Sequence, residues 1–284
     1  MLNKPKQLVV KFGTEVLLGA QWRNEKRLKQ AIFNDIASQV VRAQTNGINI
    51  TIVSSGAIQA GRERIQKTEN NIIRLSNALS RKKELAGIGA RHLLNMWGRG
   101  FERNNREIAQ LWVTFSNLSS DGELQSIYSA ILNYHDLNII PIINENDVVS
   151  DNEIKLMESG LSENDSLTRM IAMLLSADDV LFITKSGGVY EKNPRDDSEA
   201  KRYSEINAET ALEIADNELS KPNSVNQQIG QGGITAKIKE ALTCFDSGMR
   251  VSIAGLDEED SIYKFAMGNN VGTMIGKSVN FEDV

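Results

Sequence analysis

Short runs of apolar residues alternate along the chain with longer stretches in which apolar residues recur at helical spacing. Residues 8–12 form the first run, which ends at Gly13, and residues 24–46 carry the first helical pattern. Runs of this length are typical of buried strands, whereas a repeat of 3.6 residues is typical of an amphipathic helix. Residues 48–53 repeat the strand pattern. The chain is therefore predicted to open with a β-α-β unit whose two strands are parallel neighbours.

The same alternation continues to the end of the chain. Helices are predicted after Gly56 and over residues 80–103, 122–132, 165–175 and 235–247. Strands are predicted over residues 108–115, 139–143 and 180–184, with a short extended segment at Val189 and Tyr190. Residues 208–215, 250–254 and 262–267 complete the alternation. The predicted fold class is α/β, and the almost wholly apolar run at 139–143 indicates parallel strands that are covered on both faces.

The pattern predicts one domain. The sequence contains no repeat at the period of solenoid proteins, no low-complexity tract and no long linker. A polar stretch over residues 152–162 separates two apolar runs and marks a soft boundary. We expect a single domain over residues 1–284, with two lobes that share one continuous sheet.

Composition narrows the class of protein. With 284 residues and 40% hydrophobic content, the chain can fill a sizeable core, and its formal net charge of -5 argues against binding to nucleic acid. One cysteine and two histidines exclude a disulfide within the chain and leave too few ligands for a metal site built on these residue types. The first residues contain no apolar stretch long enough for a signal peptide or a membrane span. We expect a cytoplasmic enzyme that acts on small molecules and has no membrane partner.

Two strings of glycine and polar residues lie near the ends of predicted strands. Residues 53–61 read VSSGAIQAG, and residues 144–147 read NEND. The carboxyl ends of parallel strands are where α/β enzymes bind ligands. Lys11 lies near the carboxyl end of the first strand, from which its side chain can reach into a cleft. The ordinary alternative is an exposed surface lysine.

A third string, GQGGITAK over residues 230–237, opens a predicted helix. Glycine-rich turns at a helix N-terminus present backbone N–H groups to phosphate. Lys237 lies in the first turn, where the helix dipole disfavours a cation unless an anionic ligand is present. The alternative is a loop whose glycines only turn the chain. Taken together, the three strings indicate phosphoryl transfer.

Asp165 stands at the start of another predicted helix, where an aspartate is also a common cap. If Asp165 faces the cleft, its carboxylate can hold the ammonium groups of Lys11 and Lys237. Those lysines then neutralise charge on a transferring phosphoryl group. Phosphoryl transfer depends on placement and charge stabilisation, so it needs no nucleophilic side chain.

Four strings together resemble a known family. Residues 10–14 (VKFGT), 54–64 (SSGAIQAGRER), 141–147 (PIINEND) and 230–237 are similar, in order and spacing, to the glutamate 5-kinases of the amino acid kinase family. The similarity extends from about residue 8 to about residue 275.

The resemblance implies a three-layer α/β/α sandwich with a central, mainly parallel sheet. It also implies ATP-dependent phosphorylation of the γ-carboxylate of L-glutamate to γ-glutamyl phosphate, the first step of proline biosynthesis. The glutamate site is expected in residues 1–155 and the ATP site in residues 156–284. Mg²⁺ is expected to bridge the phosphates and to be held mostly by phosphate oxygens and water.

The resemblance further assigns roles to residues. Lys11, Asp165 and Lys237 are expected to be catalytic, with Asp165 organising the two lysines. The residues expected to bind glutamate are Ser55, Gly56, Asn144, Asp147 and Asn164. The residues expected to bind the nucleotide are Lys11, Gly13, Thr184, Lys185, Gly230, Gln231, Gly232, Gly233 and Lys237. A carboxylate such as that of Asp147 suits the ammonium group of an α-amino acid. No residue is expected to bind metal directly.

The chain departs from the family pattern at several positions. Glu15 stands where a small hydroxyl residue is common, and Glu163 and Lys185 each stand where the pattern has aspartate. A carboxylate beside a triphosphate is repulsive. We therefore expect Glu15 to point outward or to bind through magnesium.

The family also implies partners. These are proline as a feedback inhibitor, glutamyl phosphate reductase as a partner enzyme, and a second copy of the chain in a homo-oligomer.

Many glutamate 5-kinases continue into a C-terminal RNA-binding-like domain, which we expect to be absent because the sequence ends at Val284. The apolar residues of 80–103 suit either a dimer face or ordinary core packing, and both alternatives stay open.

Two other functions stay in view. The chain could be an amino acid kinase family phosphotransferase that acts on another acceptor, such as a nucleotide or an isoprenyl phosphate, but Ser55 with Asp147 favours an amino acid. It could also be a ligand-sensing pseudokinase that kept only the fold. The presence of Lys11, Asp165 and Lys237 speaks against that alternative.

Overall fold

A single mixed sheet organises the molecule. The computed structural model describes residues 5–18, 27–66, 78–149, 163–194, 197, 199–219, 234–277 and 280–281. Within them, nine strands form one sheet in the order β3-β4-β2-β1-β5-β7-β8-β6-β9. The strands are β1 (Lys6–Phe12), β2 (Ile48–Ser54), β3 (Ile108–Val113), β4 (Ile140–Glu145), β5 (Asp179–Ile183), β6 (Tyr203–Ile206), β7 (Arg250–Ala254), β8 (Thr273–Ile275) and β9 (Asn280–Phe281).

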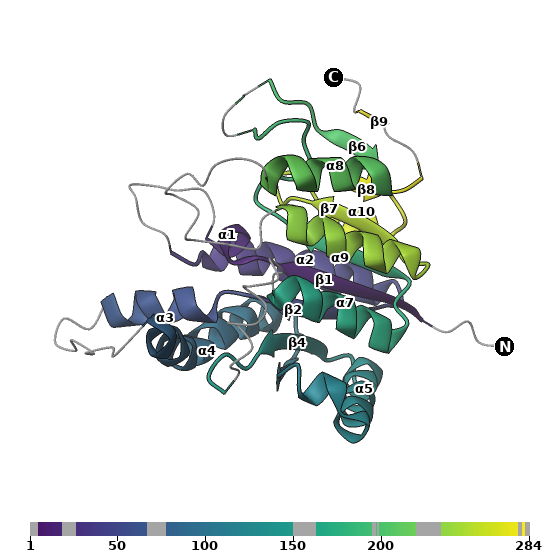
Figure 1. Cartoon of the computed structure of the whole chain (residues 1–284). Helices are drawn as coiled ribbons and strands as arrows, with labels where there is room; N and C mark the ends of the chain where they lie inside the picture. Colours follow the sequence, from purple (N-terminus) through teal and green to yellow (C-terminus); the bar gives the residue numbers. More distant parts are fainter. Residues whose placement is uncertain are drawn as a thin grey trace.

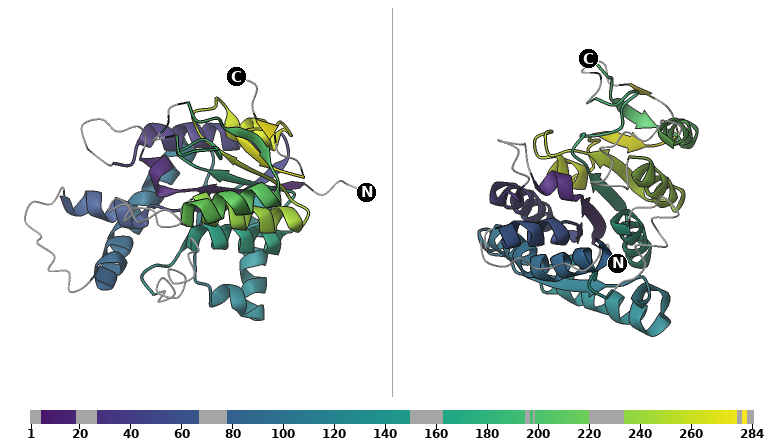
Figure 2. Two further views of the ribbon diagram at one scale, coloured as in Figure 1. Left: turned by 45° about the horizontal axis from the view of Figure 1, so that its top comes forward. Right: turned by 60° about the vertical axis from the view of Figure 1, so that its left-hand side comes forward.

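Helices cover both faces of the sheet (Figures 1 and 2). They are α1 (Thr14–Leu17), α2 (Gln30–Thr45), α3 (Ala57–Gln66), α4 (Ala78–Glu102), α5 (Asp121–Asp136), α7 (Glu163–Leu175), α8 (Ala208–Leu219), α9 (Ile234–Asp246) and α10 (Ser261–Ala266), with a short 3-10 helix at Asn117–Ser119. One layer contains α2, α4 and α10, and the other contains α5, α7, α8 and α9. The predicted three-layer α/β/α sandwich is confirmed.

The sheet is mainly parallel, as the pattern of buried strands predicted. β1 pairs in parallel with β2 on one side and with β5 on the other, and β3, β4 and β7 extend the parallel set. Antiparallel pairing occurs between β7 and β8 and between β6 and β9. The prediction that the first two strands are parallel neighbours is confirmed.

The sheet changes winding direction at β1. The chain leaves β1 through α2 and adds β2 on one side, whereas the connection from β4 through α7 crosses to β5 on the other side. Parallel α/β sheets bind ligands beyond the carboxyl ends of the strands at such a switch point. The carboxyl end of β1 is therefore the place to look for a site.

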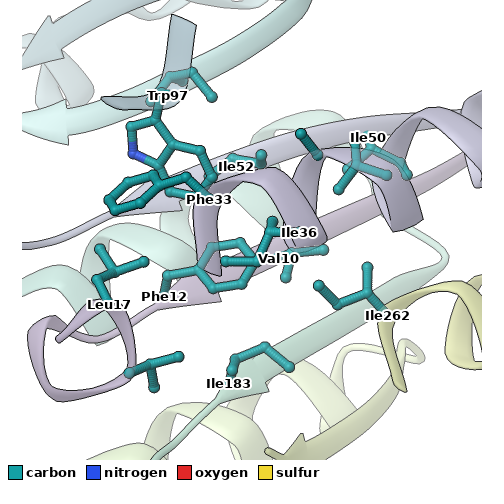
Figure 3. Packing of buried hydrophobic residues seen from close by; sticks show 14 of the residues in the cluster. Val10, Phe12, Leu17, Phe33, Ile36, Ile50, Ile52, Trp97, Ile183 and Ile262 are labelled. Carbon is teal, nitrogen blue, oxygen red and sulfur yellow. The ribbon is translucent and has the colours of Figure 1, made fainter. Parts of the chain in front are cut away.

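Alternation along β1 divides its side chains between the two layers. Leu8, Val10 and Phe12 face the layer of α2, whereas Val9 packs in the opposite cluster, beside α7. Successive side chains of a strand point to opposite faces, so Lys11 shares the face of Val9. Figure 3 shows the cluster on the α2 side, in which Phe12 and Val10 lie beside Ile36.

Trp97 confirms ordinary core packing for one face of the long helix α4, while the dimer face that the sequence also allowed stays a prediction. Its ring packs against Phe33, with centroids 4.7 Å apart, and against Phe12, with centroids 5.5 Å apart. Leu93 and Met96 of α4 are buried with it, whereas Ile88 is exposed. This face of α4 belongs to the core of the subunit.

The observed elements differ from the predicted ones in a few places. Residues 144 and 145 are the last residues of β4 and not a tail beyond it, and α5 continues to Asp136. The extended segment at Val189 and Tyr190 forms only a single bridge, from Tyr190 to Arg202. β6, β8 and β9 were not predicted because strands of two to four residues are too short to show a period. The boundary expected at residues 152–162 lies outside the described residues.

A search of the described helices for a membrane span found none with the length and apolar character that crossing a bilayer requires.

Candidate active site

Lys11 and Asp165 form a buried ion pair at the carboxyl end of β1. The Lys11 side chain points toward α7, and its Nζ lies 2.5 Å from Oδ1 of Asp165. Lys11 is only 2% exposed and Asp165 is fully buried. Asp165 lies in the first turn of α7, so it meets the lysine where the helix begins beside the end of the strand.

Lys237 reaches the same carboxylate from α9. Its Nζ donates to Oδ2 of Asp165 at 3.2 Å, and its side chain is 16% exposed. Each oxygen of the aspartate therefore faces one ammonium group. The three charged groups carry a net charge of +1, which attracts an anion into this part of the molecule.

Burial makes the charge of Lys11 sensitive to its neighbours. The pKa of the Lys11 ammonium is lowered to about 8: desolvation is the largest cause, the Asp165 carboxylate partly opposes it, and the positive charge of Lys237 acts in the same direction as desolvation. A lysine whose pKa is lowered this far lies in an environment from which water is largely excluded. Perturbed pKa values of this kind concentrate at functional sites.

Gly13 lies beside this ion pair at the end of β1, and Ser55 and Gly56 lie at the neighbouring end of β2. A Cβ added at Gly13 would lie 3.7 Å from Nζ of Lys11, so the ammonium stands directly beside the Gly13 backbone. The N–H of Ser55 donates to the carbonyl of Phe12 at 3.0 Å, which holds the end of β2 against the end of β1. Gly56 then adopts a φ of 113°, a conformation that favours glycine, before α3 begins.

The residues expected to bind glutamate lie at the same edge of the sheet. Asn144 is buried near the end of β4, and Asp147 lies half-buried in the loop that follows. Asn164 lies beside Asp165 in α7, and its buried Oδ1 accepts no hydrogen bond from the part of the chain that the structure describes. A buried amide oxygen of this kind is suited to an N–H donor from a ligand.

The residues expected to bind the nucleotide begin after β5. The N–H of Thr184 donates to the carbonyl of Ala254 at 2.7 Å, which fixes the chain where β5 meets β7. Lys185 is exposed, and its Nζ lies 3.8 Å from a carboxylate oxygen of Glu15. Glu15 is partly exposed and turns toward this lysine. The remaining nucleotide residues, Gly230, Gln231, Gly232 and Gly233, lie outside the described residues, as does the side chain of Glu163.

The described residues offer no ready-made site for a metal ion. Among residues 5–18, 27–66, 78–149, 163–194, 197, 199–219, 234–277 and 280–281, no group of three or more histidine, cysteine, aspartate or glutamate side chains gathers. Asp165 is already paired with two ammonium groups.

Two buried hydrogen bonds that hold the site in place were not anticipated. The indole N–H of Trp97 donates to Oγ of Ser54 at 3.0 Å, which ties the end of β2 to α4. Oε1 of Glu63 in α3 accepts from the N–H of Leu28 at 2.6 Å. Neither pairing leaves a signal in the sequence, because the partners are far apart along the chain.

Comparison with known proteins places this geometry in a family. The family model described as the amino acid kinase family matches residues 6–255. The chain belongs to the amino acid kinase family. The match includes Lys11, Asp165 and Lys237, so the ion-pair cluster lies within the family domain.

Similar proteins within this family include glutamate 5-kinases. The chain is 31% identical to a glutamate 5-kinase of Photorhabdus laumondii over 273 residues, which cover 96% of this chain and 69% of the relative. It is 32% identical to a glutamate 5-kinase of Dehalococcoides mccartyi (strain CBDB1) over 281 residues, or 99% of this chain and 71% of the relative. The resemblance to glutamate 5-kinases that the sequence strings indicated is confirmed.

A solved structure supports the fold. The UMP kinase from Bacillus anthracis superposes with a TM-score of 0.61 at 15% identity, and the match covers 98% of this chain and 99% of that one. At this level of identity the likeness concerns the arrangement of strands and helices alone.

Proposed function

We propose that this amino acid kinase family member phosphorylates the γ-carboxylate of L-glutamate with ATP and produces γ-glutamyl phosphate and ADP. The observation that carries the proposal is the placement of the Lys11 and Lys237 ammonium groups on the two oxygens of a fully buried Asp165. The similarity to glutamate 5-kinases over most of the chain supports the choice of acceptor. The product is a mixed anhydride suited to the first step of proline biosynthesis.

In this proposal the two lysines stabilise the negative charge of the reactants. An oxygen of the γ-carboxylate forms a bond to the γ-phosphorus of ATP, and the bond from that phosphorus to the oxygen it shares with the β-phosphate breaks. Both reactants are anions, so their approach costs electrostatic free energy. Lys11 and Lys237 lower that cost by neutralising the phosphoryl oxygens, and Asp165 keeps both ammonium groups in place. The Gly13 backbone, next to the Lys11 ammonium, lies where it can donate to the same oxygens.

Glutamate is assigned to the ends of β2 and β4. Ser55 and Gly56 follow β2, and Asn144 and Asp147 lie at and beyond the end of β4, so all four share one edge of the sheet. The carboxylate of Asp147 suits the α-ammonium group, and the buried Oδ1 of Asn164 can accept from the same group. We therefore assign the amino acid substrate to the N-terminal lobe, residues 1–155, with Asn164 contributing from the start of α7.

The nucleotide is assigned to the C-terminal lobe, residues 156–284. Thr184 and Lys185 follow β5, and Lys237 lies in the first turn of α9, directly after the glycine-rich string at 230–233. Mg²⁺ arrives with ATP as part of the substrate and is held mostly by phosphate oxygens and water.

The proposed biological setting rests on the resemblance and on composition. Proline as a feedback inhibitor, glutamyl phosphate reductase as the enzyme that takes the product, and self-association all remain proposals. A reductase partner suits the chemistry, because an acyl phosphate hydrolyses readily and benefits from rapid consumption. The cytoplasm remains the proposed compartment on the basis of cysteine content alone.

A panel of acceptors tests the substrate. ADP release would be measured with ATP, Mg²⁺ and, in turn, L-glutamate, L-aspartate, N-acetyl-L-glutamate, UMP and an isoprenyl phosphate. The proposal predicts release that depends on L-glutamate, with N-acetyl-L-glutamate inactive because it lacks the ammonium group. Release that depends on UMP or the isoprenyl phosphate instead would replace glutamate as the acceptor, and the absence of release with every acceptor would favour a pseudokinase.

A further inference from the structure

A second polar bridge joins the two helices that carry Asp165 and Lys237. Glu240 of α9 is 4% exposed, and its Oε1 accepts a hydrogen bond from Oγ of Ser166 in α7 at 2.6 Å. Its Oε2 accepts from Nε of Arg169, also in α7, at 2.5 Å. Both oxygens of a buried carboxylate on α9 are thus occupied by donors from α7.

This bridge lies close to the ion pairs of the proposed active site. Ser166 follows Asp165 directly, and Glu240 follows Lys237 by three residues, which is about one helical turn. Residues three apart lie on the same face of a helix. The contact from Lys237 to Asp165 and the contacts from Glu240 to Ser166 and Arg169 therefore join the same faces of α7 and α9.

The bridge restricts how the two helices can pack. Apolar contacts between helices tolerate small shifts along or around the axis, because their energy depends little on direction. Hydrogen bonds to a buried carboxylate do not, because a displaced partner leaves a buried charged group without compensation. Glu240 thus favours one register of α9 on α7.

The position of Lys237 depends on that register. Its side chain is long and carries a single ammonium group at the end of four methylene groups, so the position of its Cα decides which sites the group can reach. With α9 in the observed register, the ammonium lies 3.2 Å from Asp165, on the opposite oxygen from Lys11.

We propose that Glu240 is a positioning residue, which fixes α9 on α7 so that the Lys237 ammonium stays beside Asp165 and Lys11. The inference deepens the proposed function and rests on it for its kinetic consequence. Its structural consequence does not depend on the substrate. If the Glu240 bridge is lost, Lys237 moves away from Asp165, whichever acceptor the enzyme uses.

Glu240→Gln provides the test, because it keeps the size of the side chain and removes its charge. One arm measures kcat and KM for glutamate. We expect kcat to fall by roughly 10- to 100-fold, since small misplacement of a catalytic group is costly, while the KM for glutamate changes by less than about threefold.

A second arm needs no activity. The pKa of Lys11 would be followed by NMR of ¹³C-labelled lysine side chains, with the Lys11 signal assigned by its loss in Lys11→Arg. The nearby charge of Lys237 lowers the pKa of Lys11, so withdrawal of Lys237 should raise that pKa by roughly half a unit or more. A purely structural role for Glu240 would leave the titration unchanged.

Asp179→Asn is the matched control. Asp179 is also a buried carboxylate, 1% exposed, and it pairs with Nε of Arg250 at 3.0 Å at the amino ends of β5 and β7. Its neutralisation should lower the melting temperature but leave kcat and the Lys11 titration unchanged.

Ser166→Ala is a second test variant, for the case in which Glu240→Gln does not fold. It keeps the pair of Glu240 with Arg169, so it should produce the same effects as Glu240→Gln at smaller size.

The outcomes separate the inference from the proposed function. A fall in kcat and a raised pKa of Lys11 in Glu240→Gln or Ser166→Ala, both absent in Asp179→Asn, would support the inference. A lower melting temperature with unchanged kcat and an unchanged Lys11 titration would overturn it. If the wild-type protein does not use glutamate, the proposed function fails, and the NMR arm still decides the role of Glu240.

Discussion

The ammonium group of Lys185 lies 3.8 Å from the carboxylate of Glu15, so two residues that depart from the glutamate 5-kinase pattern pair with each other. Glu15 lies in α1, directly after the end of β1, and Lys185 follows β5. The lysine compensates the negative charge that Glu15 brings to this edge of the sheet. Glu15 is partly exposed and has a specific partner, while its orientation relative to a bound triphosphate stays a prediction.

This pair predicts opposite effects of two substitutions on nucleotide binding. Lys185→Met should raise the KM for ATP by roughly threefold to tenfold, because it removes a cation and leaves Glu15 without compensation. Glu15→Gln should lower that KM or leave it unchanged, because it frees Lys185 and removes a repulsive charge. Both side chains are partly exposed, so the effects should be modest and should shrink at high salt. The same direction of change in both variants would contradict the pairing.

The pKa of Lys11 predicts how activity depends on pH. Burial lowers that pKa to about 8, so Lys11 loses its proton and its positive charge as the pH rises through that value. Because the proposed mechanism needs the cation, kcat/KM should fall on the alkaline side with an apparent pKa of about 8.

Lys11→Arg gives the control, since a guanidinium keeps its charge throughout this range. The variant should be slower overall but should lack this alkaline limb. A wild-type profile that stays flat to about pH 9.5 would show that the charge of Lys11 is not required.

The contact between α3 and α4 predicts a severe effect of a single methyl group. A Cβ at Gly89 would lie 1.8 Å from the carbonyl oxygen of Ala57 and 2.4 Å from the backbone nitrogen of Gly61. Gly89→Ala should therefore force the helices apart and lower the free energy of unfolding by about 3 kcal/mol or more.

Gly122→Ala is the matched control for that measurement. Gly122 lies near the start of α5, and an added Cβ would meet nothing within 4 Å. This variant should gain up to about 1 kcal/mol, because alanine has less conformational freedom in the unfolded chain. Urea denaturation of both variants measures the difference, and equal stability of the two would show that α3 and α4 are not packed this closely.

A buried histidine predicts a loss of stability in acid. Nε2 of His135 lies 3.1 Å from Oγ1 of Thr51, and burial lowers the pKa of His135 from 6.5 to about 4. The unfolded chain therefore binds a proton between these pH values that the folded chain does not bind. The stability is fully present above pH 6.5 and declines as the pH falls toward 4, by about 2 kcal/mol between pH 7 and pH 5.

His135→Gln should be less stable at neutral pH but should lose less stability on acidification than the wild type. Urea denaturation at pH 7 and pH 5 gives the comparison. An identical loss in both proteins would mean that other groups account for the acid sensitivity.

Much of the fold was predictable from the sequence because its strands are buried on both faces. Apolar runs such as residues 48–53 and 139–143 distinguish these strands from amphipathic helices. The short strands β6, β8 and β9 gave no such pattern, and their positions depend on pairing with distant strands. The predicted end of β4 was wrong because Asn144 and Glu145 are polar residues, yet both are buried within the strand.

The charged center of the candidate site could be anticipated for a different reason. Lys11 and Asp165 lie at the junctions of strands and helices, where topology alone brings residues to one edge of the sheet. The partners of Glu240 could not be anticipated. In an amphipathic helix, a glutamate among apolar residues is usually taken as part of the exposed face, and only the packing of α9 on α7 shows that it is buried.

Trapping of the acyl phosphate tests the central claim most directly. Hydroxylamine converts γ-glutamyl phosphate to a stable hydroxamate, which would be measured for the wild type, Lys11→Met, Lys237→Met and Lys239→Met. Lys239 is an exposed lysine two residues from Lys237 on the same helix. We predict hydroxamate that depends on glutamate and ATP, a loss of roughly 100-fold or more in Lys11→Met and Lys237→Met, and wild-type rates in Lys239→Met. Undiminished hydroxamate formation by folded Lys11→Met or Lys237→Met, or none by the wild type, would contradict the account.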